Sequence, residues 1–312
     1  DLSDCVRKNG EHYEAIGDHA DMWSGELTIS GRKYQVAIKV LRGGPMRKTN
    51  SQTKLDKARQ LDLERYGQIW RNLDDPHIAR FWGLAFNFGP MPALILDYYP
   101  HGNIVGYIKK QKVPNEGRMR LLHEIAQGIQ FLHSCQPSIV HGDIRGANVL
   151  INGNGQAVLA DYQLAFIIES SDFTSVKTAG TCRWTAPEIM SPPEDDSPTD
   201  SPSLFTLSSD IFSFAMTFIE VFTEQVPFAT KKNDSSVIFA ILDGHRPDLP
   251  SYVQSNEALT VLLKNCWAEI PSERPTAEEV CNDLAHVHPF FAPLRPCLMS
   301  ILAHSTTVQI LA

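Results

Sequence analysis

The sequence predicts an α+β fold, with strands around one main helix early in the chain and a larger helical part after them. The chain has 312 residues, which is long enough for one large domain or for two lobes with separate cores. Short β-branched runs, such as residues 33–40, fall early in the chain. Longer segments with helical spacing, such as residues 118–135, follow them.

The composition excludes several classes of protein. Apolar residues make up 43% and charged residues 21%, which is ordinary for a soluble globular protein. The net charge of −8 argues against nucleic acid or an anionic membrane as the partner. The six cysteines are widely spaced without a C-x-x-C pair, which favours free thiols in a reducing compartment and hence a cytoplasmic protein.

Neither end of the chain indicates a targeting or membrane segment. No apolar run approaches the roughly 18 residues of a membrane span. No signal peptide is visible, and because the first residue is Asp1, the start is either trimmed or internal to a longer chain.

The N-terminal lobe is expected to consist of strands around one helix. Strands are predicted near residues 15–17, at 21–27 and at 33–40, and again at 81–85 and 93–96. Helical spacing runs from Lys54 to Leu73. Lys39 lies inside the apolar third strand, where an ammonium group needs an anionic partner. Taken alone, a surface lysine on an edge strand is the simpler interpretation.

Residues 97–103 break the strand pattern and separate the two lobes. Helices are predicted over 104–112 and 118–135, and others near 257–268 and 277–287. In the second helix the apolar residues follow the helical period and should be core: Leu121, Leu122, Ile125, Ala126, Ile129 and Leu132.

The residue types of a phosphoryl-transfer site follow, in His141-Gly142-Asp143-Ile144-Arg145-Gly146-Ala147-Asn148-Val149-Leu150. Asp143 lies two residues after a histidine and five residues before Asn148. Eleven residues past Leu150, Asp161 ends a second predicted strand over 156–160. Two carboxylates and one amide, held on a strand hairpin, can hold Mg²⁺ and orient a hydroxyl group.

These residues resemble the catalytic loop and the metal loop of the eukaryotic protein kinases, with Gly142 in place of arginine. Five motifs match in the required order. Besides the catalytic loop they are Val36-Ala37-Ile38-Lys39, Asp161-Tyr162-Gln163 of the metal loop, the stretch 180–188 that closes the activation segment, and Ser209-Asp210-Ile211-Phe212-Ser213-Phe214. The resemblance covers about residues 14–288 and implies a bilobal protein-kinase fold. The stretch 180–188 resembles the tyrosine-kinase-like group, and Thr181 favours serine or threonine as acceptor.

The resemblance also implies how the chain is divided. Residues 1–13 would be an N-terminal extension, 14–97 the kinase N-lobe, 98–288 the C-lobe and 289–312 a C-terminal tail. Within the C-lobe, residues 191–204 form a Ser/Pro/Asp-rich insert whose composition cannot make a core. A solvated loop is the favoured interpretation of this insert, ahead of phosphorylation at its Ser-Pro pairs.

ATP and Mg²⁺ are the implied cofactors, and a protein is the implied substrate. Asp143 would orient and accept from the acceptor hydroxyl, Asp161 and Asn148 would hold Mg²⁺, and Lys39 would contact the α- and β-phosphates. The other positions implied to bind the nucleotide come from the first loop, the strands, the hinge between the lobes and the strand after the catalytic loop: Gly17, Ala37, Leu96, Asp97, Tyr99 and Leu150. By its position, Leu96 is the gatekeeper.

Three departures from the family pattern affect how ATP is positioned. The first loop, 16–23, keeps one glycine, and its Asp18 and Asp21 would bring negative charge near the phosphates. The helix position that holds a glutamate in the family is Tyr66, so either the helix register differs or the ion pair with the strand lysine is absent, which we favour. Gln163 replaces a glycine and should restrict switching of the metal loop.

Two contacts within the C-lobe are also expected. Glu188 should form a structural ion pair with Arg274, and Asp210 should hold the backbone of the catalytic loop. Residues 164–179 carry the hydroxyls of the activation segment. Because Gly142 replaces the arginine that would answer a phosphate there, we expect weak control by phosphorylation.

Three classes of function remain open from the sequence. The first is phosphoryl transfer from ATP to protein serine or threonine, and the second is a pseudokinase scaffold, since the residues that position ATP are altered. The third, phosphoryl transfer to a small molecule, is disfavoured because Ala186-Pro187-Glu188 suits a peptide substrate. The retained catalytic set favours the enzyme, and label transfer from ATP to protein discriminates the three.

Overall fold

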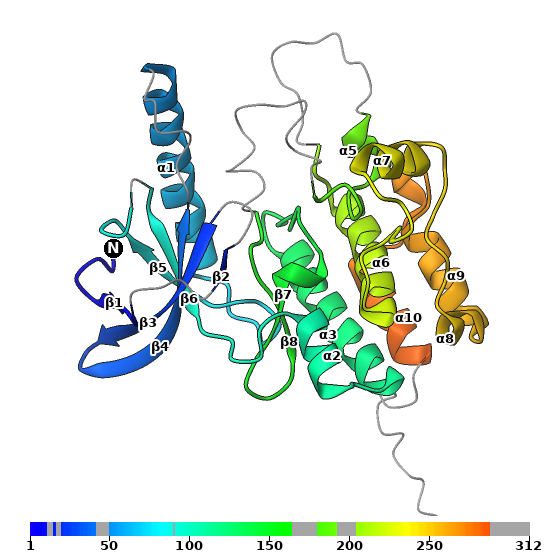
Figure 1. Ribbon diagram of the computed structural model, residues 1–312, viewed down its shortest axis with the longest axis horizontal. Helices are drawn as coiled ribbons and strands as arrows, with labels where there is room; N and C mark the ends of the chain where they lie inside the picture. Colours follow the sequence, from blue (N-terminus) through cyan, green and yellow to red (C-terminus); the bar gives the residue numbers. More distant parts are fainter. Residues whose placement is uncertain are drawn as a thin grey trace, which may run out of the picture.

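The computed structural model describes residues 1–10, 15–16, 20–41, 50–89, 91–163, 180–191 and 204–287. A sheet with a long helix forms the N-terminal lobe, and helices form most of the C-terminal lobe (Figure 1). The predicted α+β class is therefore confirmed. The activation segment 164–179, the insert residues 192–203, the tail 289–312 and Gly17 of the first loop lie outside the described residues.

The described strands of the N-terminal lobe form one antiparallel sheet of six strands. These are β1 (Val6–Lys8), β2 (Ala15–Ile16), β3 (Ala20–Ile29), β4 (Arg32–Leu41), β5 (Phe81–Ala85) and β6 (Ala93–Asp97). The order is β1-β3-β4-β6-β5, with β2 also paired to β3. β3 and β4 form a tight hairpin in which Met22 lies opposite Lys39, and this register decides which side chains face the site.

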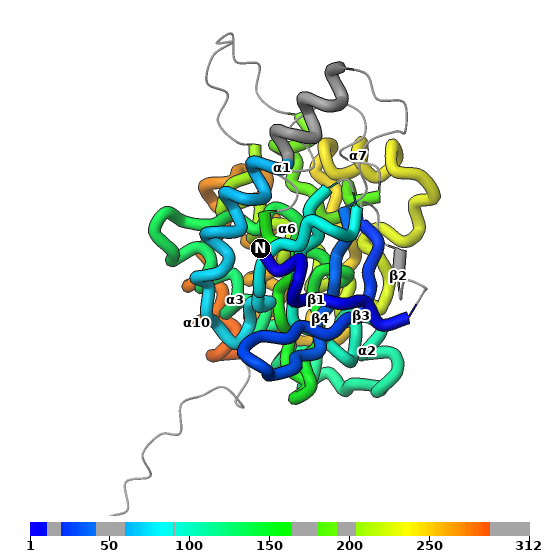
Figure 2. Tube along the Cα trace, turned by 90° about the vertical axis from the view of Figure 1, so that its left-hand side faces the viewer, coloured from blue at the N-terminus to red at the C-terminus, as the bar shows by residue number. Residues whose placement is uncertain are grey.

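β1 extends the sheet further towards the N-terminus than the sequence predicts (Figure 2). Val6 pairs with Leu27 of β3, and the backbone N–H of Leu2 donates to the carbonyl of Leu84 at 2.7 Å. The described part of the predicted N-terminal extension, residues 1–10, thus packs on the sheet of the lobe. The polar composition hid this, since only alternate residues of an edge strand face the core.

α1 (Asn50–Trp70) packs against β5 and is the long helix of the N-terminal lobe (Figure 1). In the half whose side chains are described, Leu63 and Trp70 are buried. The Trp70 ring meets Phe81 of β5 edge-on, with ring centroids 5.4 Å apart. Trp70 is the last residue of α1 and belongs to the core that continues into the C-terminal lobe. This end of α1 therefore lies close to the C-terminal lobe.

The C-terminal lobe is arranged around α6. Its helices are α2 (Ile104–Gln111), α3 (Asn115–Ser134), α5 (Pro187–Met190), α6 (Leu207–Thr223), α7 (Asp234–Leu242), α8 (Ser251–Gln254), α9 (Glu257–Cys266) and α10 (Ala277–Val287), with 3₁₀ turns η1 (Gly146–Asn148) and η2 (Pro271–Glu273). A reciprocal cap between Thr206 and Ser209 begins α6. Its Phe212, Phe214 and Phe218 are fully buried, so α6 is a rigid base for what lies on it.

A short hairpin, β7 (Val149–Ile151) and β8 (Ala157–Leu159), lies between the sheet and the helices (Figure 1). The N–H of Leu159 donates to the carbonyl of His77, and the N–H of Ala79 donates to the carbonyl of Leu159, both at 2.8 Å. β8 is therefore tied to the segment between α1 and β5, and Asp161 follows directly at the junction of the lobes. Among the described helices, none has the length and apolar character needed to cross a bilayer.

Candidate active site

The catalytic loop, residues 141–148, is tied to α6 by Asp210. The Asp210 carboxylate is 1% exposed and accepts from the backbone N–H groups of His141 at 2.7 Å and Gly142 at 2.9 Å. It also lies 3.0 Å from Nε2 of His133. Gly142 has φ +82°, a region that glycine adopts without strain. The predicted role of Asp210 is confirmed, and the loop is fixed by buried, charge-assisted hydrogen bonds.

Asp143 is held in place but remains partly exposed. The amide nitrogen of Asn148 donates to Oδ2 of Asp143 at 2.6 Å and to its carbonyl at 2.8 Å. The guanidinium Nε of Arg145 lies 3.1 Å from Oδ1. Because these bonds fix the carboxylate without covering it, Asp143 can receive a hydroxyl from outside.

Lys39 and Asp161 approach one another from different lobes. Nζ of Lys39, on β4, lies 2.5 Å from Oδ2 of Asp161, and the two side chains are 13% and 22% exposed. This ion pair provides the anionic partner that a lysine in an apolar strand needs. Asp62 and Glu64 are the carboxylates in the part of α1 whose side chains are described, and neither pairs with Lys39. In this part of the helix the contact that Lys39 makes with Asp161 takes the place of an ion pair with α1.

A column of rings supports the metal loop, residues 161–163. The Tyr162 ring lies edge-on to Trp70, with centroids 5.8 Å apart, and 6.4 Å from the ring of His141. Its hydroxyl donates to the carbonyl of Ala79 at 3.1 Å. Burial raises the pKa of Tyr162, so the hydroxyl stays protonated and keeps this bond. Tyrosine in place of phenylalanine therefore adds a polar tether to an apolar contact.

Gln163 adopts the backbone conformation that a glycine would take. Its φ is +60°, and Asp161 has φ +64°. For a residue with a side chain this left-handed conformation costs about 1–2 kcal/mol. The N–H of Gln163 donates to the carbonyl of His141 at 2.8 Å, and its Oε1 accepts from Nε1 of Trp70 at 3.1 Å. The substitution does not prevent Asp161 from meeting Lys39.

One face of the N-terminal sheet carries the predicted nucleotide-binding residues of β4 and β6. Residues directly opposite in antiparallel strands point to the same face. Lys39 lies opposite Met22, and Ala37 lies opposite Leu96. Met22 therefore lies on the same face as Lys39, which the sequence did not reveal. The signal for it is its position opposite Lys39, which can be recognised only once the hairpin register is known.

Asp21 and Asp97 point to the other face. Asp21 lies opposite Val40 and Asp97 lies opposite Val36, and both valines belong to the outer core of the sheet. Oδ1 of Asp97 accepts from the indole of Trp82 at 2.6 Å. The expectation that Asp21 places negative charge near the phosphates is wrong, because adjacent side chains of a strand alternate between faces. The Asp97 side chain therefore lies on the face opposite to that of Lys39.

Tyr99 of the hinge and Leu150 of β7 come together at the junction of the lobes. Both pack against the small apolar cluster of Ala79, Val158 and Ala160. The Tyr99 hydroxyl accepts from the N–H of Arg80 at 3.3 Å. The structure thus brings together two predicted residues that are far apart in the sequence.

The oxygen atoms of this site suit Mg²⁺. Asp161 offers a carboxylate, and Asn148 offers an amide oxygen because its nitrogen is turned toward Asp143. The N–H of Ala160 donates to the carbonyl of Asn148 at 2.9 Å. Because Asp161 follows Ala160 directly, this bond keeps Asp161 close to Asn148. Within the described ranges no group of three His, Cys, Asp or Glu forms a metal cluster. Mg²⁺ does not need one, since a nucleotide's phosphates supply the remaining ligands.

The predicted pair of Glu188 and Arg274 is confirmed. Two parallel bonds of 2.7 and 2.8 Å join the guanidinium to the carboxylate. Arg274 also donates to the carbonyls of Ala268 at 2.9 Å and Ser208 at 3.0 Å. The pair therefore ties the segment after residue 180 to α6 and to the segment before α10.

Glu220 of α6 is a further residue of the site that the sequence did not reveal. One of its oxygens, Oε2, accepts from the N–H of Gly146 at 2.8 Å and from Nε1 of Trp184 at 2.9 Å. A Cβ at residue 146 would lie 2.8 Å from Cδ of Glu220, so glycine permits this approach. The carboxylate links the catalytic loop to the segment ending in Glu188. The signal for it was an acid among the apolar residues of the last turns of α6.

Replacing Glu220 by Gln should change how stability depends on pH. Burial raises the pKa of Glu220 above its ordinary value, against the effect of the two donors. The folded state thus holds this proton more tightly, so the contribution of Glu220 to stability is present at low pH and is lost as pH rises through its folded pKa. Glutamine can accept both bonds on its one oxygen without a charge. We therefore expect the melting temperature of the wild type, relative to that of E220Q, to decrease from pH 4 to pH 8. A difference between the two melting temperatures that stays constant with pH would contradict this.

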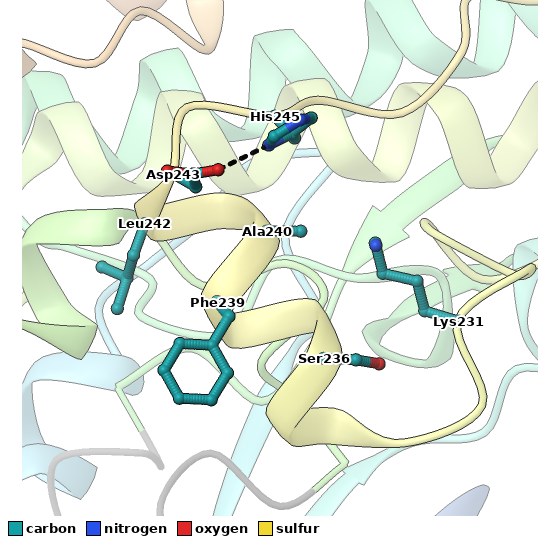
Figure 3. Close-up of a pocket in the computed structure, with 7 residues that line it drawn as sticks. All are labelled: Lys231, Ser236, Phe239, Ala240, Leu242, Asp243 and His245. Atoms are coloured by element: carbon teal, nitrogen blue, oxygen red, sulfur yellow. Dashed lines mark ion pairs between the residues drawn. The ribbon is translucent and has the colours of Figure 1, made fainter.

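A surface pocket lies on α7, away from these residues (Figure 3). It is lined by Lys231, Ser236, Phe239, Ala240, Leu242, Asp243 and His245. Phe239 projects from the helix and is 72% exposed. None of the lining residues belongs to the catalytic loop, the metal loop or the hinge, so we assign the pocket no part in the chemistry of the site.

The chain belongs to the protein tyrosine and serine/threonine kinase family, whose model matches residues 14–284. It is 30% identical over 220 residues to the probable serine/threonine-protein kinase SIS8 of Arabidopsis thaliana, covering 70% of this chain and 20% of that protein. The putative serine/threonine-protein kinase/receptor R831 of Acanthamoeba polyphaga mimivirus is 31% identical over 272 residues, covering 86% and 15%. Receptor-interacting serine/threonine-protein kinase 4 of Mus musculus is 28% identical over 197 residues, covering 61% and 24%. The matches thus span a quarter or less of each of these relatives.

Proposed function

We propose that the chain transfers the γ-phosphoryl group of ATP to serine or threonine hydroxyls of a protein substrate. The observation that carries this proposal is the meeting of a complete catalytic set at the junction of the lobes. Lys39 lies 2.5 Å from Asp161, and Asn148 lies 2.6 Å from Asp143. Relatives named as serine/threonine-protein kinases support the acceptor class.

In the proposed reaction the protein acts mainly by positioning groups and neutralising charge. Asp143 accepts a hydrogen bond from the substrate hydroxyl and takes its proton as the hydroxyl oxygen attacks the γ-phosphorus. The bond from the γ-phosphorus to the β–γ bridging oxygen breaks at the same time, and ADP is the leaving group. Arg145, beside Asp143, adds positive charge near the transferred group. Lys39 exchanges part of its contact with Asp161 for the α- and β-phosphates. Asp161 and Asn148 would hold Mg²⁺, which would neutralise phosphate charge.

The nucleotide is proposed to lie against the inner face of the sheet. Ala37, Leu96 and Met22 would contact the adenine from β4, β6 and β3, with Leu150 on the side of the C-terminal lobe. Asp97 and Tyr99 would bind through their backbone, because the side chain of Asp97 is bonded to Trp82 on the other face. Gly17 remains a proposed member of the loop over the phosphates.

A pseudokinase scaffold is the alternative on the same fold. Its support is the position of Tyr66 and Gln163, where the family places residues that help to position ATP. We favour the enzyme because the acid, amide and lysine of the reaction are all kept and all meet. We also propose a cytoplasmic location, since the described cysteines are free thiols.

The test of the acceptor class is phosphoamino acid analysis. The purified chain is incubated with γ-labelled ATP, Mg²⁺ and a generic protein substrate, and the labelled protein is hydrolysed. We expect label on phosphoserine or phosphothreonine. Label on phosphotyrosine would overturn the acceptor class, and label on a free alcohol or sugar with none on protein would overturn the protein substrate.

Replacing Asp161 by Asn should reduce transfer by at least about a hundredfold, because the site loses its anionic metal ligand and the counterion of Lys39. Nucleotide affinity should also lose its dependence on Mg²⁺. Glu64→Gln is the matched control, since it removes a carboxylate of α1 that forms no ion pair with Lys39. Equal Mg²⁺ dependence of nucleotide binding in D161N and the wild type would exclude Asp161 as the ligand.

A further inference from the structure

Gln163 is bonded to the end of α1. Its Oε1 accepts a hydrogen bond from the indole nitrogen of Trp70 at 3.1 Å. Trp70 is the last residue of α1 and is 2% exposed. Gln163 lies two residues after Asp161. A single hydrogen bond therefore joins a helix of the N-terminal lobe to the loop that carries the proposed metal ligand.

Glutamine at this position has a cost that its side chain must offset. Its φ of +60° lies where residues with a side chain are strained, so glycine would be better suited to the backbone alone. The side chain supplies an acceptor for a buried indole N–H, which would be costly to leave without one. The hydrogen bond thus gives a physical reason for a residue that the backbone by itself disfavours.

In the part of α1 whose side chains are described, no carboxylate links the helix to the metal loop through Lys39. Lys39 pairs with Asp161, and neither Asp62 nor Glu64 reaches it from the part of α1 whose side chains are described. Tyr66 stacks on Trp70 instead, with ring centroids 6.0 Å apart. On the described side of α1, the polar contact with the metal loop is the one from Trp70 to Gln163.

We propose that the Trp70–Gln163 hydrogen bond couples the position of α1 to that of Asp161, which makes Gln163 a positioning residue for the site. The metal loop is held by the backbone bond from residue 163 to His141, by the Tyr162 hydroxyl and by this side-chain bond. Of these three hydrogen bonds only the last leads to α1, where the Trp70 ring also packs edge-on against Tyr162. The inference rests on the proposed function in so far as it takes Asp161 to be a metal ligand.

The test separates the hydrogen bond from packing. Gln163→Met keeps the length of the side chain but removes the acceptor, whereas Gln163→Glu keeps an acceptor. Trp70→Phe removes the donor and keeps a ring. Gln60→Ala is the control, because it removes a glutamine side chain of α1 that donates to Glu64 within the helix.

The first measurement is hydrogen exchange of the Trp70 indole, followed by NMR among the signals of the five tryptophans and assigned by its loss in W70F. We expect exchange at this indole to be roughly tenfold faster in Q163M, and unchanged in Q163E and Q60A. Backbone exchange at residues 161–163 should also rise in Q163M and in W70F.

The second measurement is the affinity for Mg·ATP by equilibrium titration. Q163M and W70F should each weaken binding roughly tenfold, and the double variant should be no weaker than either single variant. Unchanged indole and backbone exchange in Q163M, or fully additive losses in the double variant, would overturn the coupling. Exchange is measured without turnover. A chain that shows this pattern but transfers no phosphate would keep the coupling and overturn the proposed function.

Discussion

The Asp143→Asn variant is expected to bind Mg·ATP as the wild type does and to transfer phosphate about a hundred to ten thousand times more slowly. Asp143 is fixed by Asn148 at 2.6 Å and by Arg145 at 3.1 Å. Asparagine fills the same space but cannot take the proton of the hydroxyl. The loss should therefore appear in kcat, with little change in the affinity for the nucleotide.

Asp243→Asn is a suitable control for this experiment. Asp243 lies on the surface beside His245, 3.5 Å away, and its side chain is 79% exposed. Removal of its charge should leave both kcat and nucleotide affinity unchanged. If D143N retained more than half of the wild-type rate, Asp143 would not be the group that receives the proton.

Arg274→Ala should destabilise the C-terminal lobe by about 3–5 kcal/mol, because removal of one partner from a buried ion pair leaves the other without compensation. Its guanidinium is fully buried in the pair with Glu188, whose side chain is 20% exposed. The carbonyls of Ala268 and Ser208 would lose their donor as well. The midpoint of urea unfolding measures the effect.

Lys33→Ala is the matched control for the ion pair. Lys33 and Glu26 form a pair whose side chains are 69% and 41% exposed, and such surface pairs contribute about 0–1 kcal/mol. If R274A does not fold, Arg274→Lys is used instead. Lysine keeps the charge but loses the two parallel hydrogen bonds to Glu188, so we expect a smaller decrease of the urea midpoint. Equal shifts in R274A and K33A would contradict the structural role of the pair.

The sequence revealed those parts of the site that depend on local spacing. The numbers of residues between Asp143, Asn148 and Asp161 are set by one loop and one hairpin. A pattern in the sequence can therefore describe them. The bond from Asp210 to the catalytic loop and the pair of Glu188 with Arg274 were inferred from motifs of the family. The structure bears out both.

The parts that the sequence did not reveal depend on register or on contacts between distant segments. The pairing of Met22 with Lys39 fixes the faces of the sheet, and without it Asp21 was placed on the wrong side. β1 is an edge strand of three residues, too short for its alternation to stand out. The bonds of Glu220 to Gly146 and of Trp70 to Gln163 join residues 74 and 93 positions apart, and no local pattern encodes such contacts.

Gln163 shows how an apparent defect in a motif can be understood from the structure. Judged by backbone freedom alone, a side chain in place of glycine should hinder the metal loop. The loop nevertheless carries Asp161 to Lys39, and the glutamine side chain reaches Trp70. The same is true of Tyr66, which cannot neutralise a lysine but stacks on Trp70. These substitutions are compatible with an intact catalytic set.

The most direct test of the account is phosphate transfer by the wild-type chain. The purified chain is incubated with γ-labelled ATP and a generic protein substrate, with Mg²⁺ present or removed by a chelator, after folding has been verified. We predict incorporation of label into protein that stops when Mg²⁺ is removed. No incorporation by a folded chain that binds Mg·ATP would contradict the account and would favour the pseudokinase scaffold.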